Sequence, residues 1–170
     1  MPNMKIVRLL LLVGAMCVAG QAFAEEMPAL SKGQTLYLPI YSHVWHGNRD
    51  KAGVPLKSLV SALVSIRNTD PTRAIRLASA RYYDTRGKLL AEYVTAPKTI
   101  GPMGTYEMYV ERKESAGGSG ANFVISWQAD APANPPMVEA LHADIQGHRT
   151  LSFITTARLL NMEDGLVNKP

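Results

Sequence analysis

Cysteine is almost missing from this sequence, since Cys17 is the single one among 170 residues. It lies in an N-terminal stretch with the features of a cleavable leader, so the mature chain would contain none. An exported chain without cysteine forms no intramolecular disulfide, and thiol-based catalysis is excluded as well. We therefore expect packing alone to stabilise the fold.

The N-terminal stretch starts with the positive charges of Lys5 and Arg8 and continues as the apolar run Leu9–Gly20. It ends in Ala22-Phe23-Ala24, the small-x-small pattern that precedes signal-peptidase cleavage. The apolar run is too short to span a bilayer. We expect residues 1–24 to be a cleavable signal peptide, which makes the protein periplasmic or secreted.

A lipoprotein leader would instead be cleaved just before Cys17. That cleavage normally requires a small preceding residue, whereas the residue here is the bulky Met16. We therefore do not expect lipid anchoring through Cys17.

Strong net charge and further long apolar runs are also missing. Removal of 24 residues from 170 leaves 146, the size of one domain, and loss of Lys5 and Arg8 leaves 16 basic against 14 acidic residues. A net charge of about +2 gives no electrostatic footprint for nucleic acid. No later run approaches the length of a transmembrane helix, so we expect no stable membrane insertion after cleavage.

Apolar runs of strand length, separated by turn residues, recur along the mature chain. They predict an all-β fold, an antiparallel immunoglobulin-like β-sandwich of about seven to eight strands over residues 34–160. Residues 25–33 are expected to form a flexible lead-in, and 161–170 a polar tail. The candidate strands are Thr35–Ser42, Ser58–Arg67, Ala74–Tyr83, Lys88–Val94, Thr105–Arg112, Ala121–Ala129, Met137–Ile145 and Thr150–Leu160.

Alternation within these runs predicts which side chains face the core, because successive residues of a strand point to opposite faces. Pro39 cannot donate a ladder hydrogen bond, which predicts an edge position for the first strand. Asp70, before Pro71, is expected to cap turn backbone. The predicted core includes Leu36, Leu38, Ile40, Phe123, Ile125 and Trp127, faced by Val60, Val64, Tyr106 and Met108.

Six segments together form a pattern that is typical of one protein family. They are Tyr41–Gly47, Ser65–Asp70, Tyr82–Leu89, Gly117–Phe123 with Trp127, Pro136–Ala140 and Ser152-Phe153. In this pattern the chain resembles a bacterial family catalogued as domain of unknown function 3124. The similarity spans about residues 34–158, and the glycine block is its most specific part. The resemblance implies a bacterial exported setting and supplies no catalytic residues.

The glycine block Gly117–Ala121 comes within one residue of the G-x-S-x-G nucleophile elbow, with Ser119 at its centre. That elbow requires a helix after the serine, whereas a strong strand pattern follows here. A phosphate-binding loop fails because the Lys-Ser/Thr ending and the helix are both missing. We interpret the block as a hairpin loop, with Asn122 hydrogen-bonding the turn.

His43 and His46 are the candidate metal ligands, for copper or zinc. An odd spacing on a regular strand sends the two rings to opposite faces, so a shared metal requires the chain to turn there. Further imidazole or thioether ligands are available in the sequence. The candidates are His142, His148, Met103, Met108 and Met137.

The loop from Tyr41 to Asp50 is also a candidate contact patch for a small ligand or an envelope partner protein. The alternative favoured for Trp45 is burial as a plug at the end of the sandwich, because a buried large aromatic stabilises by roughly 1.5–3 kcal/mol. No catalytic constellation is recognised, so we expect a non-catalytic binding protein. The candidate binding residues are Tyr41, His43, Trp45, His46, Arg49, Ser119 and Asn122.

Overall fold

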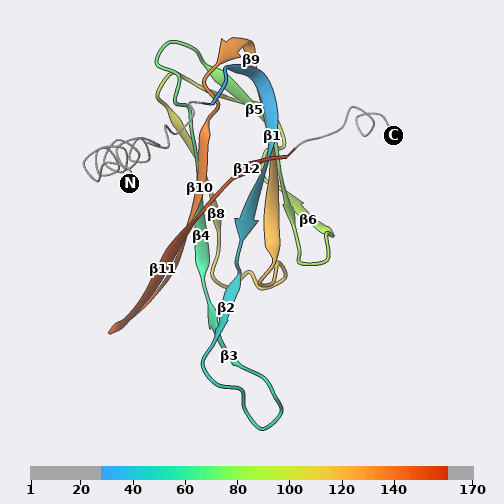
Figure 1. The fold of residues 1–170 in the computed structure, drawn as a ribbon, viewed down its shortest axis with the longest axis vertical. Coiled ribbons are helices and arrows are strands. Elements are labelled where there is room, and N and C mark those ends of the chain that lie inside the picture. Colours follow the sequence, from blue (N-terminus) through green and yellow to red (C-terminus); the bar gives the residue numbers. More distant parts are fainter. Residues whose placement is uncertain (1–27, 161–170) are drawn as a thin grey trace, which may run out of the picture.

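The structure, a computed structural model, describes residues 28–160 as two antiparallel β-sheets and a separate two-stranded ribbon (Figure 1). Within this range the chain contains no helix, and hence none long and apolar enough to cross a membrane. The expected signal peptide and polar tail lie outside the described residues. The predicted all-β class with antiparallel pairing is confirmed.

The strands divide among the sheets as follows. The first sheet has the order β12-β1-β9-β5-β6, with β7 also pairing β5: β1 (Ser31–Ile40), β5 (Ile75–Tyr83), β6 (Leu89–Glu92), β7 (Lys98–Ile100), β9 (Ala121–Ala133) and β12 (Arg158–Leu159). The second has the order β11-β10-β4-β8: β4 (Ser61–Arg67), β8 (Thr105–Val110), β10 (Met137–Gln146) and β11 (Arg149–Thr156). The ribbon pairs β2 (His43–His46) with β3 (Leu56–Leu59).

The core lies between the two sheets and contains the side chains that the alternation predicted. Phe123, Ile125 and Trp127 of β9 are at most 1% exposed. Val64 and Met108 of the second sheet are also buried in this cluster. The exceptions are Tyr106, which is half-buried, and Val60, which is buried outside the main cluster.

The described residues form twelve strands, more than the seven to eight expected, partly because two predicted strands are divided. Ser58–Arg67 breaks at Val60, whose N–H donates to the carbonyl of Ser42 where the ribbon begins. Thr150–Leu160 breaks at Ala157, after which the chain crosses to the first sheet as β12. At both breaks the chain passes from one sheet to another, and the alternation of apolar residues does not indicate such a change.

The first strand starts at Ser31, within the expected lead-in, and an irregularity in its pairing precedes Gly33. The prediction that this first strand lies at the edge of a sheet is partly correct. β12 lies outside β1 but pairs only with Leu36 and Tyr37. Pro39 lies beyond that pairing. The carbonyl of Thr35 accepts a hydrogen bond from the N–H of Leu160, next to β12. The backbone N–H and C=O groups of the odd-numbered residues of β1 therefore point away from β9. The missing N–H of Pro39 therefore costs no bond to β9.

Asp70 caps turn backbone, as predicted. Its Oδ1 accepts hydrogen bonds from the N–H groups of Thr72 (2.9 Å) and Arg73 (2.8 Å), and its Oδ2 accepts one from Asn134 (3.1 Å). The bond from the Thr72 backbone is the largest of the influences that hold the pKa of Asp70 well below its usual range. This turn lies at the end of the sheets opposite to the ribbon (Figure 1).

Candidate functional site

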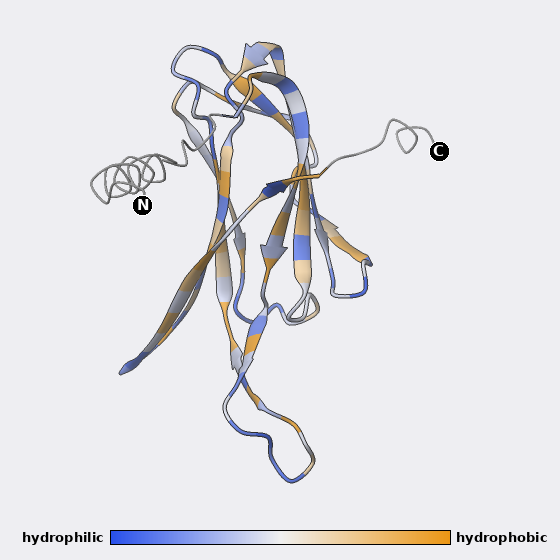
Figure 2. Cartoon of the chain, in the orientation of Figure 1, coloured by the Kyte–Doolittle hydropathy of each residue, from blue (hydrophilic) through white to orange (hydrophobic). Residues whose placement is uncertain are grey.

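The ribbon of β2 and β3 extends beyond the ends of both sheets (Figure 1), and its connecting loop is hydrophilic over much of its length (Figure 2). Asp50 orders this loop, because its Oδ1 accepts hydrogen bonds from the N–H groups of Ala52 (2.8 Å) and Val54 (2.9 Å). Arg49 is exposed in the same loop. The loop therefore carries Arg49 away from the sheets.

One face of β2 carries His43 and Trp45. The two rings meet edge to face with 4.9 Å between their centroids, and Lys57 Nζ is 5.9 Å from the centroid of Trp45. His43 is buried, and neither ring nitrogen has a hydrogen-bond partner among the described residues. Burial is the main cause, with the charge of Lys57, of its lowered pKa, so the imidazole is neutral.

The favoured interpretation of Trp45 as a buried plug is wrong. Its side chain is 45% exposed, because β2 belongs to the ribbon and not to either sheet. The end of the core that Trp45 was expected to close is covered instead by the glycine loop, which contacts Ser42 and Tyr82. Trp45 instead presents an aromatic surface next to Lys57.

His46 lies on the opposite face of β2 and contacts a second strand pair. Its Nε2 is 3.0 Å from Ser58 Oγ on β3. Arg149 of β11 reaches both groups, with Nη2 donating to Ser58 Oγ at 2.8 Å and lying 3.4 Å from His46 Nε2. This face of the ribbon is therefore tied to the tip of the β10–β11 hairpin.

The regular strand conformation of β2 separates the two candidate metal ligands, His43 and His46, onto opposite faces. Over residues 28–160, no three histidine, cysteine, aspartate or glutamate side chains gather so as to hold a metal ion. The proposed thioether donors are also dispersed: Met108 is in the core, whereas Met103 and Met137 are exposed on other segments. Nothing in this geometry favours the metal-binding alternative.

His142 is fully buried on β10 and takes part in an aromatic cluster. The N–H of Tyr41 donates to its Nε2 at 3.1 Å, and its ring stacks on Phe153 with 4.5 Å between centroids and an interplanar angle of 2°. Tyr41 packs edge-on against both rings. Burial lowers the pKa of His142 to about 4. This histidine is therefore a neutral acceptor within the fold.

The glycine loop covers the core next to the ribbon. The N–H of Ser42 donates to the carbonyl of Gly118 at 2.9 Å, which places the loop beside the start of β2. Glu114 Oε2 accepts hydrogen bonds from the hydroxyls of Tyr82 (2.8 Å) and Ser42 (3.2 Å). A Cβ on Gly117 would collide with the Tyr82 hydroxyl. Glycine is needed here for close approach.

Ser119 and Asn122 do not join the histidines. Ser119 is in the turn before β9, and the strand that follows confirms that the nucleophile-elbow context fails. Asn122 is a ladder residue of β9, between Pro39 of β1 and Tyr83 of β5. The glycine loop is therefore a packing element of the fold.

A cleft of about 490 Å³ lies where the ribbon meets the β10–β11 hairpin. β3 forms one wall, and the other walls come from Arg112, just after β8, and from the ends of β10 and β11. The lining residues are Lys57, Ser58, Leu59, Arg112, Asp144, Gln146 and Arg149. We call this set the basic cleft.

Hydrogen bonds hold the charged groups of the basic cleft in place. Asp144, 6% exposed, accepts from Arg112 Nε at 2.9 Å and from Gln146 Nε2 at 2.7 Å through the same Oδ1. The bond from Gln146, with the charges of Arg112 and Arg149, lowers the pKa of Asp144. Asp144 is therefore ionised, and it is the single carboxylate among the lining residues.

Sequence reasoning found His46 but missed Arg112, Asp144 and Arg149. Asp144 alternates with buried residues of β10, so a charged residue at an inward position was the available signal. Arg112 and Arg149 gave no such signal, because both lie near strand ends where arginine is ordinarily solvated. Their assembly around Asp144 requires the sheet order.

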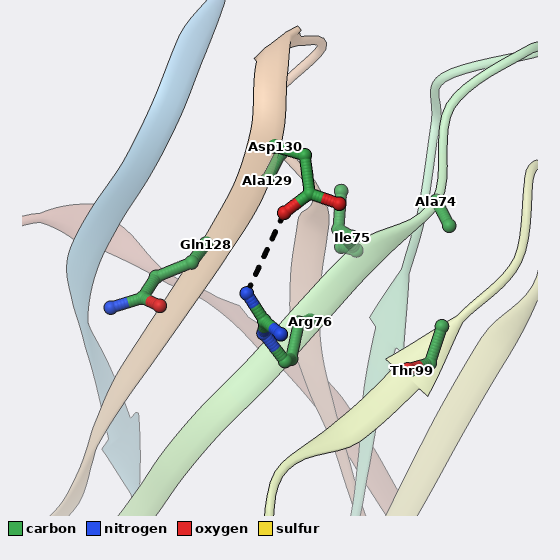
Figure 3. Close-up of a pocket in the computed structure, with 7 residues that line it drawn as sticks. All are labelled: Ala74, Ile75, Arg76, Thr99, Gln128, Ala129 and Asp130. Carbon is green, nitrogen blue, oxygen red and sulfur yellow. Dashed lines mark ion pairs between the residues drawn. The ribbon is translucent and has the colours of Figure 1, made fainter.

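A second cleft, of about 70 Å³, lies between β5, β7 and β9. Figure 3 shows Arg76 and Asp130 meeting across it, with 3.6 Å between Nη2 and Oδ1. Both side chains are at least half-exposed, so this ion pair contributes little to stability. The small volume makes it a weaker candidate than the basic cleft.

Comparison with known proteins places this architecture in a family. The family model described as protein of unknown function (DUF3124) matches residues 33–160. The chain belongs to this family. The match confirms the resemblance drawn from the sequence and covers the whole basic cleft.

The other comparisons add little. No curated protein matches the chain. The crystal structure of Thermotoga maritima 1070 is similar at 10% identity, with 74% of this chain and 92% of that chain covered. Its TM-score is 0.40, a likeness too distant to carry an argument.

Proposed function

We propose that this protein is an exported bacterial envelope protein that binds a ligand or partner without catalysing a reaction. Export is supported by the leader pattern of residues 1–24. Two antiparallel sheets around one core support an immunoglobulin-like β-sandwich as its scaffold. In this proposal, the mature protein works in the periplasm or outside the cell.

The basic cleft is the observation that carries the binding proposal. Ligand sites are concave and contain a few polar groups held in fixed positions. Asp144 and Ser58 are both more than nine-tenths buried, and each is bonded to an arginine of the cleft. Because these bonds exist without a ligand, little ordering entropy is lost when one binds.

The contacts of Ser58 support binding in place of catalysis. Ser58 and His46 have the separation of a nucleophile and its base. However, Arg149 donates to the serine oxygen and lies beside His46 Nε2, so the atom that would accept the proton faces a fixed cation. Among the described residues, no carboxylate hydrogen-bonds His46 to orient it as in a triad.

Binding at the basic cleft is tested by NMR on the isotopically labelled protein purified from periplasm. The probes are the low-molecular-mass fraction of a periplasmic extract and, separately, its protein fraction. We expect either fraction to shift the amide signals of Ser58, Asp144 and Arg149. The signal of Gly87, in a remote turn, serves as the internal reference. Unchanged cleft signals with both fractions would contradict the proposal.

Export makes a separate prediction. Cleavage after Ala24 should leave Glu25 as the first residue of the protein recovered from the periplasm or medium, as measured by intact mass. A matched variant, Ala24→Leu, should retain the leader, because signal peptidase requires a small residue at that position. A mature form that begins with lipid-modified Cys17 would overturn this prediction.

A further inference from the structure

We propose that the basic cleft binds an oxyanion, namely a phosphate or sulfate group borne by the ligand. This inference rests on the proposed binding function and specifies the chemistry of the ligand. It follows from three properties of the cleft: its excess of positive charge, the hydrogen-bond donors left free on its arginines, and the contacts that fix those arginines.

The charge balance of the cleft favours an anion. Arg112 and Arg149 contribute two positive charges, and Asp144 contributes one negative charge, which leaves an excess of one. Lys57 also lines the cleft, but its Nζ lies over Trp45 on the other face of the ribbon. An anionic group on a ligand would balance the excess.

The two arginines retain donors for such a ligand. A guanidinium carries five N–H donors in a planar fork that matches the oxygens of phosphate and carboxylate groups. Arg112 contacts Asp144 through Nε, and Arg149 contacts Ser58 and His46 through Nη2. Among residues 28–160, no hydrogen bond engages either terminal nitrogen of Arg112 or Nη1 of Arg149, so these donors are available to an oxyanion in the cleft.

The same contacts fix where those donors lie. Asp144 is anchored by Gln146 as well as by Arg112, and Ser58 is a buried residue of the β3 strand. Arg112 is thus held by Asp144 of β10, and Arg149 by Ser58 of the ribbon.

Titration with inorganic phosphate and with sulfate, followed by amide chemical shifts, tests this inference. Chloride at matched ionic strength is the reference for non-specific screening. We expect saturable shifts at Ser58 and Asp144 with either oxyanion and none with chloride. Arg149→Gln and Arg112→Gln should each weaken binding about tenfold or more, since each removes charge-assisted hydrogen bonds.

Arg86→Gln is the matched control, because Arg86 is exposed in the turn after β5, away from the cleft. It should bind like the parent. Anionic phosphatidylglycerol vesicles form a further arm. Binding to vesicles as well as to phosphate would place the oxyanion on a lipid headgroup, and binding to phosphate or sulfate alone would place it on a soluble ligand.

Several outcomes would overturn the inference. They are the absence of saturable binding by phosphate, sulfate and vesicles alike, or equal losses in Arg149→Gln and Arg86→Gln. If the periplasmic extract still shifted the cleft signals, the proposed binding function would stand and its ligand would not be an oxyanion. If the extract also failed, both proposals would fall.

Discussion

Replacement of Trp127 by alanine should lower the free energy of unfolding by about 3–5 kcal/mol, the usual cost of emptying a large buried aromatic site. Trp127 is 1% exposed on β9, where its backbone pairs with Gln34 of β1 on one side and Leu77 of β5 on the other. Because strands hold the site from both sides, the cavity left by alanine has little scope to collapse.

Urea unfolding of the parent and variant measures this difference. Trp45→Ala is the matched control, since Trp45 is 45% exposed on the ribbon and should cost about 1 kcal/mol or less. Trp127→Phe should cost less than Trp127→Ala, because it keeps an aromatic ring and removes an N–H that has no partner among the described residues. Equal stability of Trp127→Ala and the parent would show that the assigned core is wrong.

Acidification should destabilise the fold between about pH 6.5 and pH 4. Burial lowers the pKa of His142 to about 4, from its ordinary value of 6.5. Over that window the unfolded chain binds a proton that the folded chain excludes, so the free energy of unfolding falls with pH. The contribution is fully present above about pH 6.5, and its loss by pH 4 is on the order of 3 kcal/mol.

Unfolding by urea at several pH values across this window measures the slope. His142→Leu should flatten it, even though the variant loses stability at neutral pH because the Tyr41 N–H loses its acceptor. His148→Gln, at an exposed position, should keep the full slope. The lowered pKa of His43 acts in the same direction, so a smaller slope should remain in His142→Leu. An unchanged slope in that variant would refute the assignment.

The local sequence pattern was sufficient to predict the features that depend on residues close together in the sequence. Alternation placed Phe123, Ile125 and Trp127 in the core because side-chain direction in a strand has a period of two residues. Turn chemistry located the cap at Asp70, since its hydrogen bonds from the N–H groups of Thr72 and Arg73 span three residues or fewer.

The same reasoning missed the features that depend on which strands pair with one another. Trp45 is apolar and close to a predicted strand, and nothing near it shows that β2 pairs with β3 in a separate ribbon. Burial of Trp45 was therefore the wrong inference. His142 alternates with core residues, but its role as acceptor for Tyr41 depends on a contact across 101 positions.

By itself, the sequence determined the all-β class, the core face of each main strand and the family resemblance, because these follow from short-range periodicity and local motifs. Only the tertiary structure decided the ribbon and the basic cleft. Arg112 and Asp144 are 32 positions apart, and Ser58 and Arg149 are 91 apart. Such groups meet only through strand order, which is set by the packing of the whole core and not by any local run of residues.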